Sequence, residues 1–164
     1  MKTETTLSRP VRIVVIGAGN RAHKYLEYAR RNPEQLRLAA IVEVNDLRRR
    51  AMADAFGLPD KYCYAHYDDF FAERLDADMV LISTPENAHF DPAVKAIDAG
   101  YHVLLEKPIA QHLDECREIA RCARRRGVLV GVCHVLRYHP YFAKIRELVA
   151  SGRLGHVVSV NHTA

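Results

Sequence analysis

The chain has 164 residues, of which 49% are hydrophobic and 27% charged, and its formal net charge is +4. These values are ordinary for a folded domain with one core, and they argue against a disordered, collagen-like or disulfide-scaffold protein. The charge is mild and mixed in sign, whereas nucleic-acid-binding proteins usually carry a basic stripe, so we expect no nucleic-acid partner.

Short, apolar, β-branched runs alternate with helical segments along the chain. Runs of this kind are typical of strands buried on both faces of a parallel sheet. The sequence predicts strands at residues 11–16, 36–44, 78–83, 101–105 and 128–133, with a further short run at 62–64, and helices at 20–31, 46–57, 68–72, 91–100, 113–126 and 140–150. This alternation indicates an α/β fold with a doubly wound parallel sheet, the Rossmann arrangement.

Capping residues mark several helix boundaries. Asp46 is expected to cap the second helix, and Asp91 stands before Pro92 in the order typical of an N-cap and a first helical residue. Arg124–Arg126 fall in the last turn of a helix that ends at Gly127. Cations there complement the helix dipole, so this run is interpreted as a solvated helix end.

The final segment has a different pattern. His156–His162 alternates apolar and polar residues, as a half-buried strand does. We therefore divide the chain into a polar tail (1–10), a Rossmann domain (11–152) and the start of a truncated C-terminal α/β domain (153–164). Because an unpaired edge strand tends to pair with another copy, we expect self-association through Val157–Val160 and a homo-oligomer.

Nothing in the sequence indicates a membrane, secretion or a metal site. No apolar stretch approaches the roughly 20 residues of a membrane span, and the first ten residues lack the apolar core of a signal peptide. The four cysteines, at 63, 116, 122 and 133, form no CxxC pair, and the histidines show no metal-ligand spacing. We expect reduced, mostly buried thiols, a cytoplasmic location, no membrane partner and no metal.

A glycine-rich turn follows the first strand and opens the first helix. Residues 17–22, GAGNRA, match the dinucleotide-binding fingerprint G-x-G-x-x-A in the required context. Gly17 permits the tight turn, Gly19 lets the backbone approach a pyrophosphate, and Ala22 allows close helix–strand packing. The N–H groups of the helix N-terminus favour phosphate binding. The alternative is a glycine turn that binds nothing.

An acidic residue stands at the end of the second strand. Glu43 lies 21 residues after Ala22, near the spacing of the ribose ligand in this fold. Its carboxylate can accept hydrogen bonds from ribose hydroxyls and would repel a 2′-phosphate, which favours NAD over NADP. Arg48–Arg50 lie about a turn or more further on and weaken this preference slightly. Alternatively, Glu43 is an ordinary acid at a strand end.

Two further motifs follow strands at the edge where open parallel sheets bind ligands. They are Ser83–His89 (STPENAH) and Glu106–Pro108 (EKP). Together with the glycine turn, the AGYHVLLEKPIA segment from Ala99 and the VCHVLRYHP segment from Val132, they resemble the Gfo/Idh/MocA oxidoreductase family. The resemblance extends from Val11 to the end of the chain.

The resemblance implies an NAD-dependent oxidoreductase that transfers a hydride to or from a sugar, polyol or related secondary alcohol. It implies that this chain is the nucleotide-binding half, with Lys107 catalytic and with Pro108 often preceded by a cis bond. The cofactor-binding residues that it implies are Gly17, Gly19, Asn20, Arg21, Ala22, Glu43, Thr84, Pro85, Asn87, His89, Glu106, Lys107 and Arg137.

Lys107 also has a chemical rationale of its own. An ammonium group in a closed site can hydrogen-bond a substrate hydroxyl and stabilise the oxyanion that develops as hydride leaves. The alternative is a surface lysine that pairs with Glu106, since such pairs are common.

Two other functions stay open. Members of the family continue into a second α/β domain that supplies most of the substrate pocket. The chain could therefore be a stand-alone NAD-binding module without chemistry, or part of an NAD-dependent glycosidase.

Overall fold

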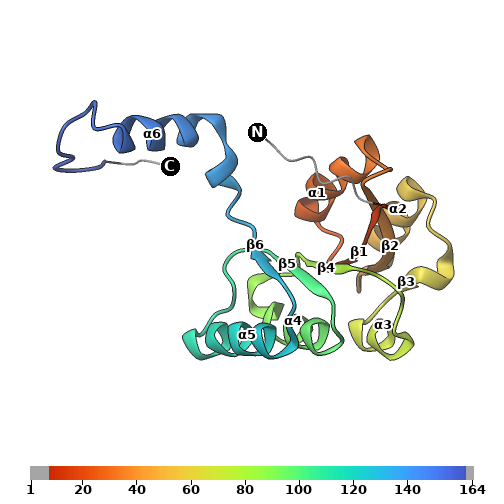
Figure 1. The fold of residues 1–164 in the computed structure, drawn as a ribbon. Helices are drawn as coiled ribbons and strands as arrows, with labels where there is room; N and C mark the ends of the chain where they lie inside the picture. Colours follow the sequence, from red (N-terminus) through yellow and green to blue (C-terminus); the bar gives the residue numbers. More distant parts are fainter. Residues whose placement is uncertain (1–7, 162–164) are drawn as a thin grey trace. The chain divides into compact units, whose positions relative to one another are not determined.

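The computed structural model describes residues 8–161, which form two compact units (Figure 1). The first runs to Cys133 and the second begins at His134. The domain boundaries predicted at residues 10 and 152 stay a prediction. Residues 1–7 of the predicted tail and 162–164 of the predicted final segment lie outside the described residues.

The first unit is built on a parallel sheet of six strands. They are β1 (Val11–Ile16), β2 (Leu36–Val42), β3 (Cys63–Tyr64), β4 (Met79–Ile82), β5 (His102–Leu105) and β6 (Val130–Val132). Their order across the sheet is β3-β2-β1-β4-β5-β6, and every neighbouring pair is parallel. The doubly wound fold is therefore confirmed, and the short run at 62–64 supplies the sixth strand.

Helices connect the strands at nearly the predicted places. The first unit contains α1 (Asn20–Arg31), α2 (Asp46–Phe56), α3 (Tyr67–Glu73), α4 (Phe90–Asp98) and α5 (Leu113–Arg126), with the 3₁₀ turns η1 (Asp60–Tyr62) and η2 (Glu86–Ala88). The second unit contains the 3₁₀ turn η3 (Val135–Tyr138) and α6 (Pro140–Ala150).

Two capping predictions are wrong. Asn45, not Asp46, caps α2, since its side-chain oxygen accepts from the Arg48 N–H at 3.0 Å. Asp91 lies inside the first turn of α4 because the preceding turn η2 leads directly into the helix at Phe90. Its carboxylate pairs with Lys95 instead, at 2.9 Å.

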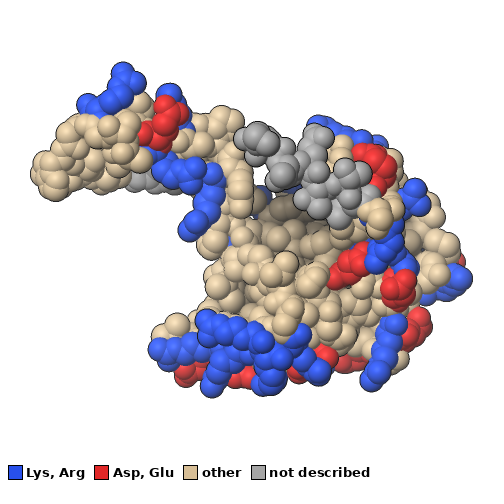
Figure 2. Space-filling view, in the orientation of Figure 1, with Lys and Arg blue, Asp and Glu red and all other residues tan. Residues whose placement is uncertain are grey.

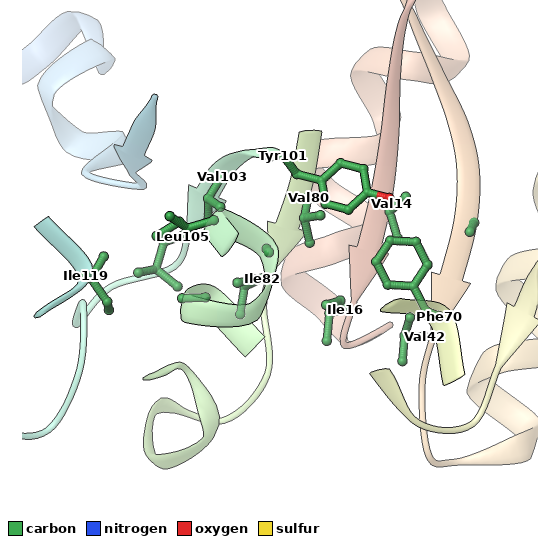
Figure 3. Close-up of a cluster of buried hydrophobic side chains, with 14 of the residues drawn as sticks. Val14, Ile16, Val42, Phe70, Val80, Ile82, Tyr101, Val103, Leu105 and Ile119 are labelled. Carbon is green, nitrogen blue, oxygen red and sulfur yellow. The ribbon is translucent and has the colours of Figure 1, made fainter. Parts of the chain in front are cut away.

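The alternation of side chains along the strands divides the core into two layers. One layer joins the strands to α3, α4 and α5 and includes Val14, Val80 and Phe70; Figure 3 shows its side chains. The other joins the opposite face of the strands to α1 and α2 and includes Val15 and Leu26. Successive strand residues point to opposite faces, so neighbours such as Val14 and Val15 serve different layers.

The pairing of β1 with β2 contains an irregularity. Ile13 lies opposite Leu38, but Val14 lies opposite Ala40, so Ala39 is an extra residue in β2. Ala39 and Ala40 consequently both belong to the layer beneath α3–α5, although they are consecutive. This is the behaviour of a β-bulge.

The arginine run at the end of α5 is exposed, and Figure 2 shows Lys and Arg side chains gathered along this helix. Arg125 and Arg126 both pair with Asp98 of α4, at 3.6 and 3.2 Å. These exposed pairs agree with the interpretation of the run as a solvated helix end.

The strand predicted at His156–His162 is absent from its described part, since residues 156–161 contain no strand. A strand needs a hydrogen-bonded partner, and the described residues offer none to this segment. Self-association through Val157–Val160 stays a prediction, and sedimentation at high concentration would test it. No helix within residues 8–161 has the length and apolarity to cross a bilayer.

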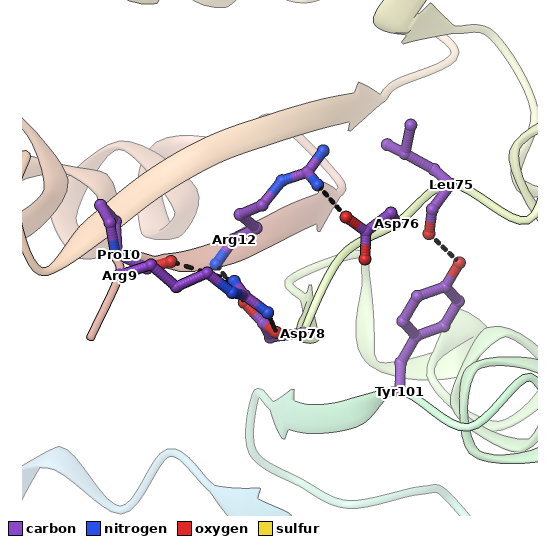
Figure 4. Close-up of polar contacts among 7 residues, drawn as sticks. All are labelled: Arg9, Pro10, Arg12, Leu75, Asp76, Asp78 and Tyr101. Atoms are coloured by element: carbon purple, nitrogen blue, oxygen red, sulfur yellow. Dashed lines mark hydrogen bonds and ion pairs between the residues drawn. The ribbon is translucent and has the colours of Figure 1, made fainter. Parts of the chain in front are cut away.

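A carboxylate fixes the amino end of β4 to the chain that enters β1. Asp78 accepts from both terminal nitrogens of the Arg9 guanidinium, at 2.6 and 2.7 Å, and from the Arg12 N–H at 2.7 Å (Figure 4). The Arg9 hydrogen bond lowers the pKa of Asp78 below its ordinary value. A lowered pKa means that the ionised carboxylate stabilises the fold.

We expect Asp78→Asn to lower the urea midpoint at pH 7, because an amide cannot accept from both arginine donors and the backbone N–H. The contribution of the carboxylate is present above the ordinary aspartate pKa and is lost as pH falls through the lowered value. The difference from wild type should therefore shrink on acidification. Asp76→Asn is the control, because Asp76 is exposed and, among the described residues, pairs only with Arg12. A difference that does not depend on pH would contradict this account.

Candidate functional site

The site lies where the order of the strands reverses. β1 and β4 are neighbours, and the chain proceeds outward from them in opposite directions. Ligands of doubly wound sheets bind at the carboxyl ends of the strands at this position. A cavity of about 440 Å³ opens there. Its lining comprises Ile16, Gly17, Gly19, Val42, Glu43, Val44, Arg48, Ala65, His66, Tyr67, Ser83, Thr84, Pro85 and Ala88.

The two glycines of the turn have different structural roles. Gly17 has a positive φ of 92°, and a Cβ there would lie 2.8 Å from backbone atoms of Ser83 and Thr84. Only glycine fits this position without displacing the end of β4. Gly19 has a φ of −79°, and a Cβ there would meet nothing within 4 Å. Its backbone therefore faces open space, which leaves room for a ligand.

Glu43 is held beneath the glycine turn. Its residue is 6% exposed, and its carboxylate accepts from the Ala18 N–H at 2.8 Å and from the Asn45 N–H at 2.9 Å. The side chain thus joins the end of β2 to the turn after β1, and it also lines the cavity. A carboxylate offers about four acceptor positions, so acceptor capacity remains for a ligand hydroxyl.

Arg48 is the cationic neighbour of this carboxylate. Its Nη2 donates to Glu43 Oε1 at 3.1 Å, and its side chain is 55% exposed and lines the cavity. Arg49 and Arg50 pair with the Asp46 carboxylate, and Arg49 also donates to the backbone carbonyl oxygen of Glu43 at 2.7 Å, although neither lines the cavity. Among the three arginines of the run, Arg48 therefore brings a positive charge to the cavity.

The cavity lining includes residues that sequence reasoning missed. Ala65, His66 and Tyr67 follow β3 and line the cavity. A strand of two residues gives a weak sequence signal, so its carboxyl end was not recognised as part of the ligand-binding edge. The alternation of strands and helices was the signal that could have located it.

A second polar cluster surrounds Glu106, which directly follows β5 and is 6% exposed. The hydroxyl of Tyr25 in α1 donates to Oε1 at 2.6 Å, and the Lys107 N–H donates to Oε2 at 3.0 Å. The Nε of Arg21 lies 3.9 Å from Oε1. Because Arg21 follows Gly19 by two residues, this cluster adjoins the glycine turn.

Tyr25 is another residue that sequence reasoning missed. Burial above all, then hydrogen bonds to Cys133 and Glu106, raise its pKa well above the ordinary value, so the phenol remains a donor. Arg21 and Tyr25 are four residues apart on α1 and face the same carboxylate. This spacing places two side chains on one helix face and was a usable signal.

Lys107 is exposed, and within the described residues its ammonium makes no ion pair or hydrogen bond. Glu106 instead binds Tyr25 and the backbone of Lys107, so the ion pair of the alternative interpretation is not formed. The bond between Lys107 and Pro108 is cis, as the resemblance suggests.

The remaining site residues of the sequence analysis are spread more widely. Thr84 and Pro85 line the cavity, whereas Asn87 is exposed on η2. Asn20 and Ala22 belong to the first turn of α1, with Ala22 buried as expected. His89 is buried, with its ring bonded to backbone carbonyl oxygens. Arg137 lies in the second unit.

The residues present fit a dinucleotide. The turn offers open space at Gly19, the N-terminus of α1 offers N–H groups, and Glu43 can accept from a ribose. No group of three histidine, cysteine or acidic side chains within residues 8–161 is arranged to hold a metal ion.

The sequence profile described as an oxidoreductase family with an NAD-binding Rossmann fold, Gfo/Idh/MocA, matches residues 11–134. The chain belongs to this family. Because the family binds NAD(P), the prediction of a nicotinamide dinucleotide cofactor is confirmed at that level.

Several members are similar to this chain. D-glucoside 3-dehydrogenase of Escherichia coli is 31% identical over 96% of this chain and 44% of its own length. D-xylose 1-dehydrogenase (NADP(+)) 2 of Haloferax volcanii is 37% identical over 74% and 36%, respectively. An inositol dehydrogenase homologue of Azotobacter vinelandii, solved with NADH and myo-inositol, is 25% identical with a TM-score of 0.77, over 92% and 43%. The chain thus spans less than half the length of these relatives.

Substitutions at the two glycines separate folding from binding. We expect Gly17→Ala to cost about 1–3 kcal/mol of stability, because the methyl group meets the end of β4 at an unfavourable φ. Gly19→Ala should keep the unfolding midpoint but lower the affinity for NADH, because its methyl group enters the space open to the pyrophosphate. Urea unfolding and NADH fluorescence titration measure the two effects. Full NADH affinity in Gly19→Ala would contradict this assignment.

Proposed function

We propose that this chain forms the cofactor-binding half of an NAD-dependent oxidoreductase that acts on a sugar, polyol or related secondary alcohol. The observation that carries the proposal is the exposed Lys107, which directly follows Glu106 and whose ammonium has no ion-pair partner among residues 8–161. The Tyr25 hydroxyl donates to Glu106 Oε1 at 2.6 Å and so connects this segment to α1. Tyr25 lies about two turns into this helix, which begins directly after Gly19. One sheet edge thus presents both a dinucleotide cradle and a cation that pairs with no described residue.

The chemistry assigned to Lys107 follows from its charge and exposure. A bound nicotinamide would accept the hydride as the C–H bond of the alcohol breaks and a carbonyl forms. The Lys107 ammonium would hydrogen-bond the oxygen of that carbon and stabilise its developing negative charge. With Lys107 as an ammonium, the hydroxyl proton would pass to water; only the neutral amine could accept it directly.

The names of relatives support the substrate class. One similar protein is a D-glucoside dehydrogenase and another a D-xylose dehydrogenase. Both names describe oxidation of a carbohydrate. A homo-oligomer and a cytoplasmic location belong to the same proposal.

The choice between NAD and NADP rests on Glu43 and Arg48. The buried carboxylate would accept from the ribose hydroxyls and oppose a 2′-phosphate. Arg48, 3.1 Å away, offsets part of that negative charge at the cavity wall. We therefore propose that the chain binds NAD more tightly than NADP, by a smaller factor than Glu43 would give without Arg48 beside it.

Titration of NAD and NADP tests this preference. Wild type should bind NAD more tightly than NADP. Arg48→Ala should raise the ratio of the NADP dissociation constant to the NAD dissociation constant by about fivefold, because it removes an electrostatic interaction worth about 1 kcal/mol. Glu43→Gln should narrow the ratio. Arg50→Ala is the matched control, because Arg50 pairs with Asp46 and does not line the cavity. Equal binding of both nucleotides by wild type would overturn the assignment of Glu43.

Lys107→Met tests the catalytic role. The variant should bind NADH within about twofold of wild type, because the ammonium forms no hydrogen bond or ion pair with residues 8–161 that would hold the fold. Turnover of a polyol and aldose panel, followed by the absorbance of reduced nicotinamide, should fall by about 10²–10⁴-fold.

The outcomes separate the possible functions. Turnover that survives Lys107→Met would refute the role of this residue. A wild-type chain that binds no nicotinamide dinucleotide would refute the proposed function. Binding without turnover of any alcohol in the panel would fit both a cofactor-binding half that lacks its substrate domain and an NAD-binding module.

A further inference from the structure

His89 lies between the loop after β4, which lines the cavity, and the loop after β5, which carries Lys107, and both of its ring nitrogens face oxygen acceptors. Nδ1 lies 2.7 Å from the carbonyl oxygen of Pro108, and Nε2 lies 3.0 Å from that of Thr84. The residue is 1% exposed, so water does not reach the ring. One histidine thus connects the loop after β4 with the loop after β5.

The number of donors on the ring decides what this arrangement means. A neutral imidazole has one N–H donor and one lone pair, whereas a carbonyl oxygen only accepts. Both distances are normal for an N–H···O hydrogen bond. A neutral ring would therefore direct a lone pair at one of the two carbonyl oxygens, while an imidazolium satisfies both.

We propose that His89 is doubly protonated in the folded protein and is a positioning residue for Lys107. By holding the Pro108 carbonyl, the ring fixes the segment that follows Lys107 against the loop after β4. The importance of this for catalysis rests on the role proposed for Lys107, whereas the protonation state does not.

Lys107 is held from the other side as well. Its own N–H donates to Glu106 Oε2, and Tyr25 fixes the same carboxylate. The backbone of Lys107 therefore lies between two anchors, Glu106 toward α1 and Pro108 toward His89. The side chain extends from a rigid segment while its ammonium remains free.

The charged groups on the surrounding elements are engaged elsewhere. Asp91 on α4 binds Tyr67 and Lys95, and Glu106 binds Tyr25 and the Lys107 N–H. Within the described residues, neither of them nor Glu86 on η2 bonds to the ring. Burial opposes the positive charge, and the dipoles of the two carbonyl groups favour it.

Nitrogen-15 NMR of the chain without cofactor tests the protonation state. Long-range ¹H–¹⁵N correlation spectra at pH 7 should show a proton on both ring nitrogens of His89. An unprotonated ring nitrogen would overturn the proposal. Hydrogen exchange of the Lys107 amide, corrected for its intrinsic rate, reports how firmly the segment that carries Lys107 is held.

Two amide substitutions then distinguish the two bonds. The side-chain nitrogen of His89→Asn can replace Nδ1 and keep the bond to Pro108, whereas that of His89→Gln can replace Nε2 and keep the bond to Thr84. We expect exchange of the Lys107 amide to rise by about tenfold or more in His89→Gln, the size expected for a lost charge-assisted bond. The rise should be clearly smaller in His89→Asn.

Unfolding midpoints of the two variants provide the control, because a merely structural role would change both variants alike. Equal exchange at Lys107 in Asn and Gln variants of equal stability would refute positioning through Pro108. Because these measurements need neither cofactor nor substrate, their outcome can be judged whether or not the proposed enzymatic function is correct.

Discussion

The close approach of β1 and β4 is the constraint on which the site depends. At Gly17 the backbone comes so near the end of β4 that a single methyl group would lie 2.8 Å from main-chain atoms of Ser83 and Thr84. The Ser83 hydroxyl donates to the Gly17 carbonyl oxygen at 2.7 Å and closes the same contact. This contact sets the position of Gly19 and the start of α1. Side chains that α1 binds, such as Glu106 through Tyr25, are therefore positioned by the same contact.

Buried polar groups at the carboxyl edge connect the loops to one another. Glu43 connects the ends of β1 and β2, Glu106 connects α1 with β5, and His89 connects the loops after β4 and β5. Each of these groups is buried and has hydrogen-bond partners, as buried polar groups need. The loops that would surround a cofactor are thus fixed by side chains from different parts of the sequence.

The sequence predicted the sheet well because buried parallel strands give continuous β-branched runs, and because the GAGNRA turn combines several independent signals. The short β3 has no such run, so the cavity residues that follow it, His66 among them, went unrecognised. Side-chain pairing was also beyond the sequence. Whether Glu106 binds Lys107 or Tyr25 depends on how α1 is rotated over the sheet, and whether Asn45 or Asp46 caps α2 depends on one backbone angle. The strand predicted at the end of the chain shows that alternation alone does not make a strand without a partner.

The bulge at Ala39 sets the phase of the chain that follows it. Since two consecutive residues there share one face, every later position of β2 is turned over relative to an uninterrupted ladder. Val42 consequently points beneath α3–α5, and the next residue, Glu43, points to the side of the Ala18 N–H. If the same sequence paired with β1 in an uninterrupted ladder, with no bulge at Ala39, the Glu43 carboxylate would point to the opposite face of the sheet. One extra residue in the middle of a strand thereby decides on which face of the sheet this buried carboxylate lies.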